Sequence, residues 1–239
     1  MPGKSFLIDT SLCTACRGCQ VACKQWNSLP AEKTVNRGTY QNPADLSFRT
    51  YKLVRFNEVV VDGKLKWLFF PDQCRHCLEP PCEMTADDPR AIFRDSATGA
   101  VLYTTNTKQA DREAIVDSCP YNIPRVSKKR TLTKCNMCIG RVKNGQLPAC
   151  VKTCPTGAMN FGDREEMLKM AKKRLSKVKK THRNARLLNP DDVRVIYLVT
   201  EDPNLYHKFA VASNSAFDIT RAVALKRLVK PLTDLTARV

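Results

Sequence analysis

The chain has 239 residues, of which 43% are apolar and 26% are charged, and these proportions exclude a disordered or fibrous protein. The longest unbroken apolar run, Val195 to Val199, is much shorter than the roughly 20 residues that span a membrane, so we expect no transmembrane segment. The net charge of +17 comes without a nucleic-acid motif, a single-sign tract or interleaved aromatic residues, so we expect no nucleic acid partner.

Twelve cysteines make the clearest pattern, and the first four form the run Cys13-x2-Cys16-x2-Cys19-x3-Cys23. Disulfides in small domains usually close longer loops, whereas thiolates on one metal centre converge locally, so this spacing indicates metal binding. The run has the spacing of bacterial ferredoxins, without the proline that often follows it.

Two insertions interrupt the cysteine pattern. Residues 25–73 contain TYKLVRF and KLKWLFF on either side of Asp62-Gly63, which predicts a β-hairpin. Residues 83–118 contain AIFRDSATGAVLYT, which predicts a second hairpin turning near Thr98-Gly99. Such insertions either form a surface that binds a partner or have a purely structural role, and the sequence leaves both possibilities open.

The remaining cysteines fall into three places along the chain. They are Cys74-x2-Cys77-x4-Cys82, the single Cys119, and Cys135-x2-Cys138-x11-Cys150-x3-Cys154. Histidine replaces cysteine in some clusters, but Cys74 and Cys77 already have the ligand spacing. We therefore interpret His76, which lies between them, as a hydrogen-bonding or surface residue.

A crossed pairing follows from the ferredoxin rule that the fourth cysteine of a run ligates the other cluster. It predicts three ligand sets: Cys13, Cys16, Cys19 and Cys154; Cys23, Cys135, Cys138 and Cys150; and Cys74, Cys77, Cys82 and Cys119. A fourth set is missing, because Gln109, Arg112 and Ile115 occupy the positions where its cysteines would fall. The twelve cysteines thus predict three [4Fe–4S] clusters with no sulfur to spare.

Other uses of these cysteines remain open at this point. Residues 135–154 alone resemble a structural zinc site, and a fully thiolate set binds zinc readily. A set of disulfides, or one site holding zinc or a three-iron cluster, are further alternatives. The crossed pairing and the Cys-Pro dipeptides at Cys119 and Cys154 favour cubanes.

The sequence predicts that the C-terminal third forms a basic extension. Residues 163–181 predict an amphipathic helix, with Met167, Met170, Ala171, Leu175 and Val178 on one face. VRVIYLV at 193–199 predicts a buried strand, and a final helix is expected over 218–229. We expect residues 163–239 to pack on a partner subunit.

Together these elements predict an α+β, ferredoxin-like fold. Residues 1–162 would form a 4Fe–4S ferredoxin-type domain of two interleaved, pseudo-symmetric modules, one of them degenerate. The two hairpins are inserted into this domain, and a helical C-terminal tail follows it.

The order of the cysteine groups, with CRHCLEPPC in the second and CPYNIPR after Cys119, resembles the iron–sulfur subunit of molybdopterin oxidoreductases over residues 5–162. Three clusters and the segment LPACVKTCPTGAMNFGD are most similar to the small subunit of soluble tungsten or molybdenum formate dehydrogenases of sulfate-reducing bacteria.

The resemblance implies a non-catalytic, electron-transferring chain in a heterodimer with a large molybdopterin catalytic subunit. Electrons would pass to an external redox partner such as a c-type cytochrome, for example a multihaem one. The same role in a polysulfide, nitrate or dimethyl sulfoxide reductase, or a free ferredoxin-like carrier, are the alternatives.

The resemblance also bears on location. The N-terminal MPGKSFLIDT lacks the apolar stretch of a secretory signal, so we expect the chain to carry no export address of its own. Co-export with a partner that bears a twin-arginine signal would place it in the periplasm, and the cytoplasm is the alternative.

Overall fold

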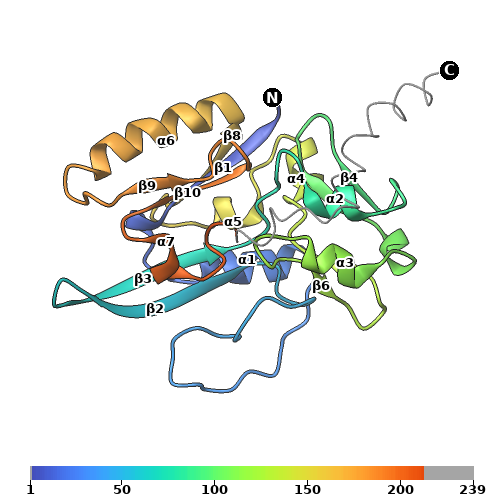
Figure 1. The fold of residues 1–239 in the computed structure, drawn as a ribbon, viewed down its shortest axis with the longest axis horizontal. Coiled ribbons are helices and arrows are strands. Elements are labelled where there is room, and N and C mark those ends of the chain that lie inside the picture. The colour runs from blue at the N-terminus through green and yellow to red at the C-terminus, as the bar shows by residue number, and fades with distance from the viewer. Residues whose placement is uncertain (1, 213–239) are drawn as a thin grey trace.

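The computed structural model describes residues 2–212, and its central element is a four-stranded sheet of order β8-β1-β10-β9 (Figure 1). The strands are β1 (Lys4–Asp9), β8 (Met159–Asp163), β9 (Arg186–Leu188) and β10 (Val195–Val199). β1 pairs in parallel with β10, and the other two pairings are antiparallel. The sheet therefore joins the start of the chain to segments from its last third.

Hydrophobic side chains on both faces explain why β1 and β10 lie at the centre of this sheet. On one face, Leu7 and Ile196 pack against helix α6 (Arg164–Val178). On the other face, Phe6 and Tyr197 belong to the core that contains the cysteines. Because all five residues of β10 are buried, it requires a neighbour on each edge and a layer on each face.

Helix α6 and strand β10 confirm the elements predicted over 163–181 and 193–199. The predicted boundary between residues 162 and 163 falls inside β8, however, and β9 and β10 extend the sheet that contains β1. Segments predicted as an extension thus share one core with the N-terminal strand. The helix predicted over 218–229 lies outside the described residues.

Both predicted hairpins are confirmed. β2 (Leu53–Val61) and β3 (Lys64–Asp72) pair in antiparallel register around Asp62 and Gly63, whose φ angles of 52° and 72° are both positive. β4 (Ile92–Arg94) and β5 (Val101–Tyr103) form the second hairpin. A shorter antiparallel pair joins β6 (Arg125–Val126) and β7 (Leu132–Thr133).

The remaining elements are short helices and 3-10 turns around the cysteines. They are η1 (Thr10–Leu12), α1 (Gly18–Trp26), α2 (Pro81–Thr85), η2 (Thr105–Lys108), α3 (Arg112–Asp117), α4 (Ile139–Lys143), α5 (Ala149–Lys152) and α7 (Pro203–Tyr206). Helix α1 packs against α5, and α2 packs against α3. Among the residues that the structure describes, no helix is both long and apolar enough to cross a bilayer.

A buried ion-pair network ties the β2–β3 hairpin to the second cysteine group. Asp72 accepts hydrogen bonds from Nε of Arg55 at 2.7 Å and from Nη1 of Arg75 at 2.8 Å. Burial alone would raise the pKa of Asp72, but Arg75 and Arg55 together hold it below its usual range. The carboxylate therefore stays charged and fixes the loop that follows β3.

We predict that Asp72→Ala lowers the free energy of unfolding by about 3–5 kcal/mol, because Arg75 would remain buried without a carboxylate partner. The measurement is denaturant-induced unfolding of the anaerobically purified protein, followed by circular dichroism. Asp88→Ala is the control, since Asp88 pairs with an exposed Arg90 and its loss is expected to change stability little. Equal stability of the two variants would contradict this role for Asp72.

Candidate metal centres

The pairing of β1 with β8 brings the first predicted ligand set together. This set contains Cys13, Cys16, Cys19 and Cys154. Ile8 lies opposite Met159, and the Asp9 N–H donates to the carbonyl of Ala158 at 2.8 Å, so the segments before Cys13 and after Cys154 run side by side. Burial above all, with the nearby Cys19 and Cys154 thiols, raises the pKa of Cys13 to about 11. Cys16 is the exposed cysteine of the chain.

The second predicted set surrounds one small cavity. All four of its members, Cys23, Cys135, Cys138 and Cys150, line this space. Met137 and Lys52 also line it. Burial, followed by the charges of the other three thiols, raises the pKa of Cys23 well above its ordinary value, so these sulfurs lie close together in a space of low polarity.

The third predicted set surrounds a separate small cavity. Its four cysteines, Cys74, Cys77, Cys82 and Cys119, all line this space. Burial, followed by the Cys74, Cys119 and Cys82 thiols, raises the pKa of Cys77 well above its ordinary value. Cys119 therefore lies beside the second cysteine group, as the crossed pairing requires, although a long hairpin insertion separates them in sequence.

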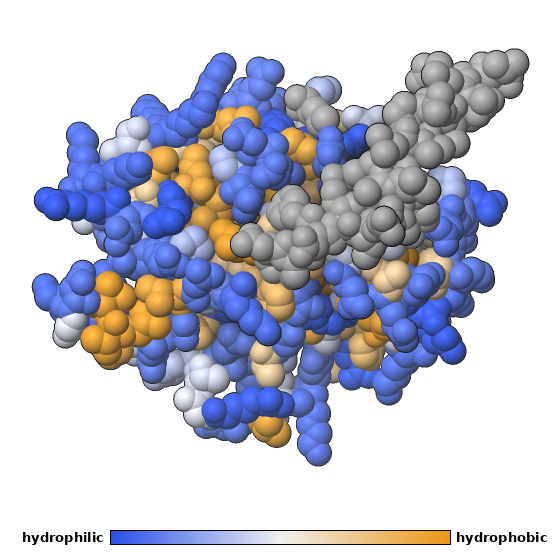
Figure 2. Space-filling model, viewed as in Figure 1, coloured by the Kyte–Doolittle hydropathy of each residue, from blue (hydrophilic) through white to orange (hydrophobic). Residues whose placement is uncertain are grey.

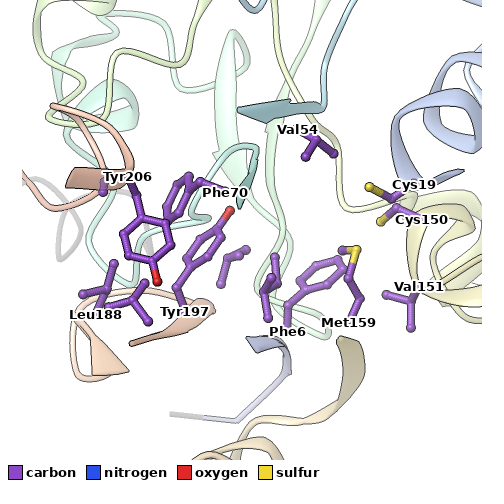
Figure 3. Packing of buried hydrophobic residues seen from close by; sticks show 14 of the residues in the cluster. Phe6, Cys19, Val54, Phe70, Cys150, Val151, Met159, Leu188, Tyr197 and Tyr206 are labelled. Atoms are coloured by element: carbon purple, nitrogen blue, oxygen red, sulfur yellow. The ribbon is translucent and has the colours of Figure 1, made fainter. Parts of the chain in front are cut away.

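The three sets form a row with the second set in the middle. Cys19 of the first set and Cys150 of the second share one hydrophobic cluster and lie side by side (Figure 3). Cys135 of the second set shares a different cluster with Cys74 of the third. The cavity lined by Cys135 and Cys150 thus lies between the other two sets.

The C-x2-C loops that begin at Cys13, Cys74 and Cys135 have the same backbone geometry. The second intervening residue, Ala15, His76 or Met137, adopts a left-handed conformation with φ between 47° and 59°. The backbone N–H of His76 donates to Sγ of Cys74 at 3.3 Å, and that of Met137 to Sγ of Cys135 at 3.5 Å. Ala15 makes the equivalent backbone hydrogen bond to Cys13. Each loop therefore turns an N–H group toward a sulfur, which favours the charged thiolate.

His76 is a buried hydrogen-bonding residue, in agreement with the prediction. Its Nδ1 accepts a hydrogen bond from the Val101 N–H at 3.0 Å, so the proton of the neutral ring is on Nε2. Burial, assisted by the charges of Lys134 and Arg194, lowers the pKa of His76 well below its usual range. The ring therefore stays neutral and braces the loop without replacing a cysteine.

The donor sets fit iron–sulfur clusters better than single zinc ions. Four soft sulfurs surround each of two cavities, and a mononuclear site would instead need its ligands around one point. Across residues 2–212, no group of three or more His, Cys, Asp or Glu side chains is arranged to hold a single metal ion. The free cysteines make no disulfides.

Sequence reasoning missed two buried lysines at these sites. Lys52 precedes β2 and lines the second cavity, while Lys134 lines the third. Lys134 directly precedes Cys135, which is a weak sequence signal. Nothing in the sequence around Lys52 distinguishes it from a surface lysine, because its burial arises from packing against distant segments.

Comparison with known proteins identifies the family. A family model described as a 4Fe–4S dicluster domain matches residues 65–164. The beta subunit of formate dehydrogenase from Megalodesulfovibrio gigas is 56% identical over 87% of this chain and 99% of its own length. The beta subunit of formate dehydrogenase 2 (cytochrome c-553) from Nitratidesulfovibrio vulgaris is 51% identical over 87% of this chain and 98% of its own length.

A more distant relative has the same role. The iron–sulfur subunit of the nitrate-inducible formate dehydrogenase of Escherichia coli is 41% identical over 84% of this chain and 70% of its own length. Such subunits transfer electrons and leave catalysis to a partner. Its cysteines gather in sets of four, and two relatives match 87% of its length at more than 50% identity, so this chain belongs to the family of formate dehydrogenase iron–sulfur (beta) subunits.

Proposed function

We propose that the chain holds three [4Fe–4S] clusters and relays electrons between two proteins. The electrons come from a pterin-metal catalytic subunit that oxidises formate, and they pass to an external redox partner. The ligand sets are the three predicted from the sequence, beginning with Cys13, Cys23 and Cys74. The observation that carries the proposal is the enclosure of four thiols around each of two cavities, next to a third set with one exposed sulfur. Clusters bound at such sites supply one-electron redox chemistry.

In this relay the protein would hold the clusters, orient them and shield them from water. Cysteine thiolates hold the iron, and the N–H groups of His76 and Met137 stabilise the sulfurs they face. Five of the eight cysteines of the second and third sets are buried and the other three are partly exposed, so these sets are largely shielded from water. Cys16, at the surface, gives the first set a way to exchange electrons with a neighbouring protein.

The partners follow from the relatives. Formate dehydrogenase beta subunits imply a catalytic subunit, and we propose a heterodimer with a tungsten or molybdenum pterin enzyme. One relative carries cytochrome c-553 in its name, which supports a c-type cytochrome as the acceptor. An assembly that reduces such a cytochrome must share its compartment, so we propose export to the periplasm together with the catalytic subunit.

A hydrophobic patch on the β2–β3 hairpin and the loop before it is our candidate for the surface that binds the catalytic subunit. We define this hairpin patch as Tyr40, Val60, Leu65 and Trp67, each at least half exposed. Figure 2 shows hydrophobic residues gathered over the tip of the β2–β3 hairpin. Arg17, which follows the exposed Cys16, donates to the Tyr40 carbonyl at 3.1 Å, so Tyr40 connects the patch to the loop of the first set. Permanent interfaces are more apolar than transient redox encounters, which favours the catalytic subunit as occupant.

We predict that Trp67→Ala weakens association with the catalytic subunit by about 2 kcal/mol, roughly 30-fold, because exposed tryptophans often anchor interfaces. The measurement is the amount of large subunit that co-purifies with the affinity-tagged chain. Val126→Ala, which truncates an exposed apolar residue on β6, is the control and is expected to change nothing. Undiminished recovery with Trp67→Ala would place the interface elsewhere.

We predict that Cys77→Ala and Cys119→Ala remove the same cluster, because both sulfurs are assigned to the third set. Low-temperature EPR of the reduced heterodimer would show one lost signal, identical in the two variants. Cys138→Ala and Cys23→Ala, assigned to the second set, should together lose a different signal. If Cys77→Ala and Cys119→Ala lost different signals, the crossed pairing would be wrong.

We predict about 12 iron and 12 acid-labile sulfide per chain in protein purified anaerobically from its native host, since each of three cubanes contains four of each. Removal of iron by a chelator should bleach the brown colour and abolish electron transfer to the acceptor. Formate oxidation by the large subunit with an artificial acceptor that bypasses this chain should survive. Stoichiometric zinc in place of iron would refute the electron-relay proposal.

A further inference from the structure

Two buried lysines lie where neighbouring cysteine sets meet. Lys52 is 2% exposed, and its ammonium donates to the Pro71 carbonyl at 3.2 Å and to Oε1 of Gln73 at 2.5 Å. All of these acceptors are neutral. Among the described residues, no ion pair joins Lys52 to a carboxylate.

Lys134 has the same character. It is 7% exposed, and its ammonium donates to the carbonyls of Val101 at 2.5 Å and Cys135 at 3.1 Å. It also lies 4.6 Å from the centre of the Tyr103 ring. The ion pairs within residues 2–212 do not include Lys134 either.

Each lysine lies between two adjacent sets. Lys52 lines the cavity of the second set together with Cys150, which lies beside Cys19 of the first set (Figure 3). Lys134 lines the cavity of the third set together with Cys82, and it donates to the carbonyl of Cys135, a member of the second set. One ammonium thus lies near each of the two junctions in the row.

An ammonium buried among neutral acceptors is costly unless a negative charge compensates it. The negative groups within reach of Lys52 and Lys134 are the cysteine sulfurs in their thiolate form. A [4Fe–4S] cluster held by four thiolates carries net negative charge, and its charge and surroundings are among the factors that set its reduction potential. A nearby fixed positive charge favours the more negative, reduced state.

We propose that Lys52 and Lys134 are the counter-charges of the two junctions and raise the reduction potentials of the clusters on either side. Lys52 serves the first and second clusters, and Lys134 serves the second and third. The proposal rests on the ligand sets of the proposed function. Both lysines are positioning residues, because they act through the clusters and touch no substrate.

The test is a potentiometric titration of the anaerobically purified heterodimer, followed by EPR, with signals assigned through the cysteine variants above. Lys52→Met is expected to lower the potentials of the first and second clusters and to leave the third unchanged. Lys134→Met is expected to lower those of the second and third and to leave the first unchanged. Lys64→Met, at the exposed turn of the same hairpin as β2, is the control for loss of one positive charge and should shift none.

Two outcomes would overturn the proposal: unchanged potentials in both buried variants, or equal shifts of all three clusters in each. If Lys52→Met assembled too little iron to titrate, Lys52→Gln, which keeps a polar head without charge, would replace it. Loss of iron from both would show a structural role and overturn the proposal for Lys52. Fewer than three clusters in the unmodified heterodimer would instead contradict the proposed function, so the two failures are distinguishable.

Discussion

The antiparallel pairing of β1 with β8 is the contact on which the cysteine arrangement depends. β1 leads directly into the first cysteine group, and β8 directly follows the last. Once Ile8 lies opposite Met159, the loop of Cys13 and the loop of Cys154 must lie side by side. The sheet therefore brings together the two ends of the cysteine pattern, between which we propose the crossed exchange of ligands, and β10 and α6 bury that sheet from its other sides.

The β2–β3 hairpin contributes residues both to the surface and to the buried cysteine sites. Lys52 immediately precedes its first strand, and Gln73 immediately follows its second, so antiparallel pairing brings the ammonium to its amide acceptor. At the same end, Asp72 orients Arg75, which stacks 4.7 Å from the centre of the Tyr197 ring on β10. A single hairpin thus presents hydrophobic residues at its tip and places buried charges among the sulfurs at its base.

The sequence predicted the features that depend on local pattern and did not predict those that depend on long-range packing. The turn at Asp62 and the periodicity of α6 are local properties, and each predicted its element correctly. VRVIYLV was predictable as a strand because it is apolar throughout, but its place between β1 and β9 depends on contacts across the whole chain. The burial of Lys52 is likewise a product of tertiary packing, which composition and spacing do not encode.

Binding of iron would offset two electrostatic costs in this fold. Burial raises the pKa of thiols such as Cys82 and Cys119, to about 12 and about 11, so in the absence of metal these sulfurs stay neutral. Lys52 meanwhile has only neutral hydrogen-bond acceptors. Binding of iron deprotonates the thiols and introduces the negative charge that the buried ammonium lacks. We therefore expect the binding of clusters at these sites to stabilise the packed core.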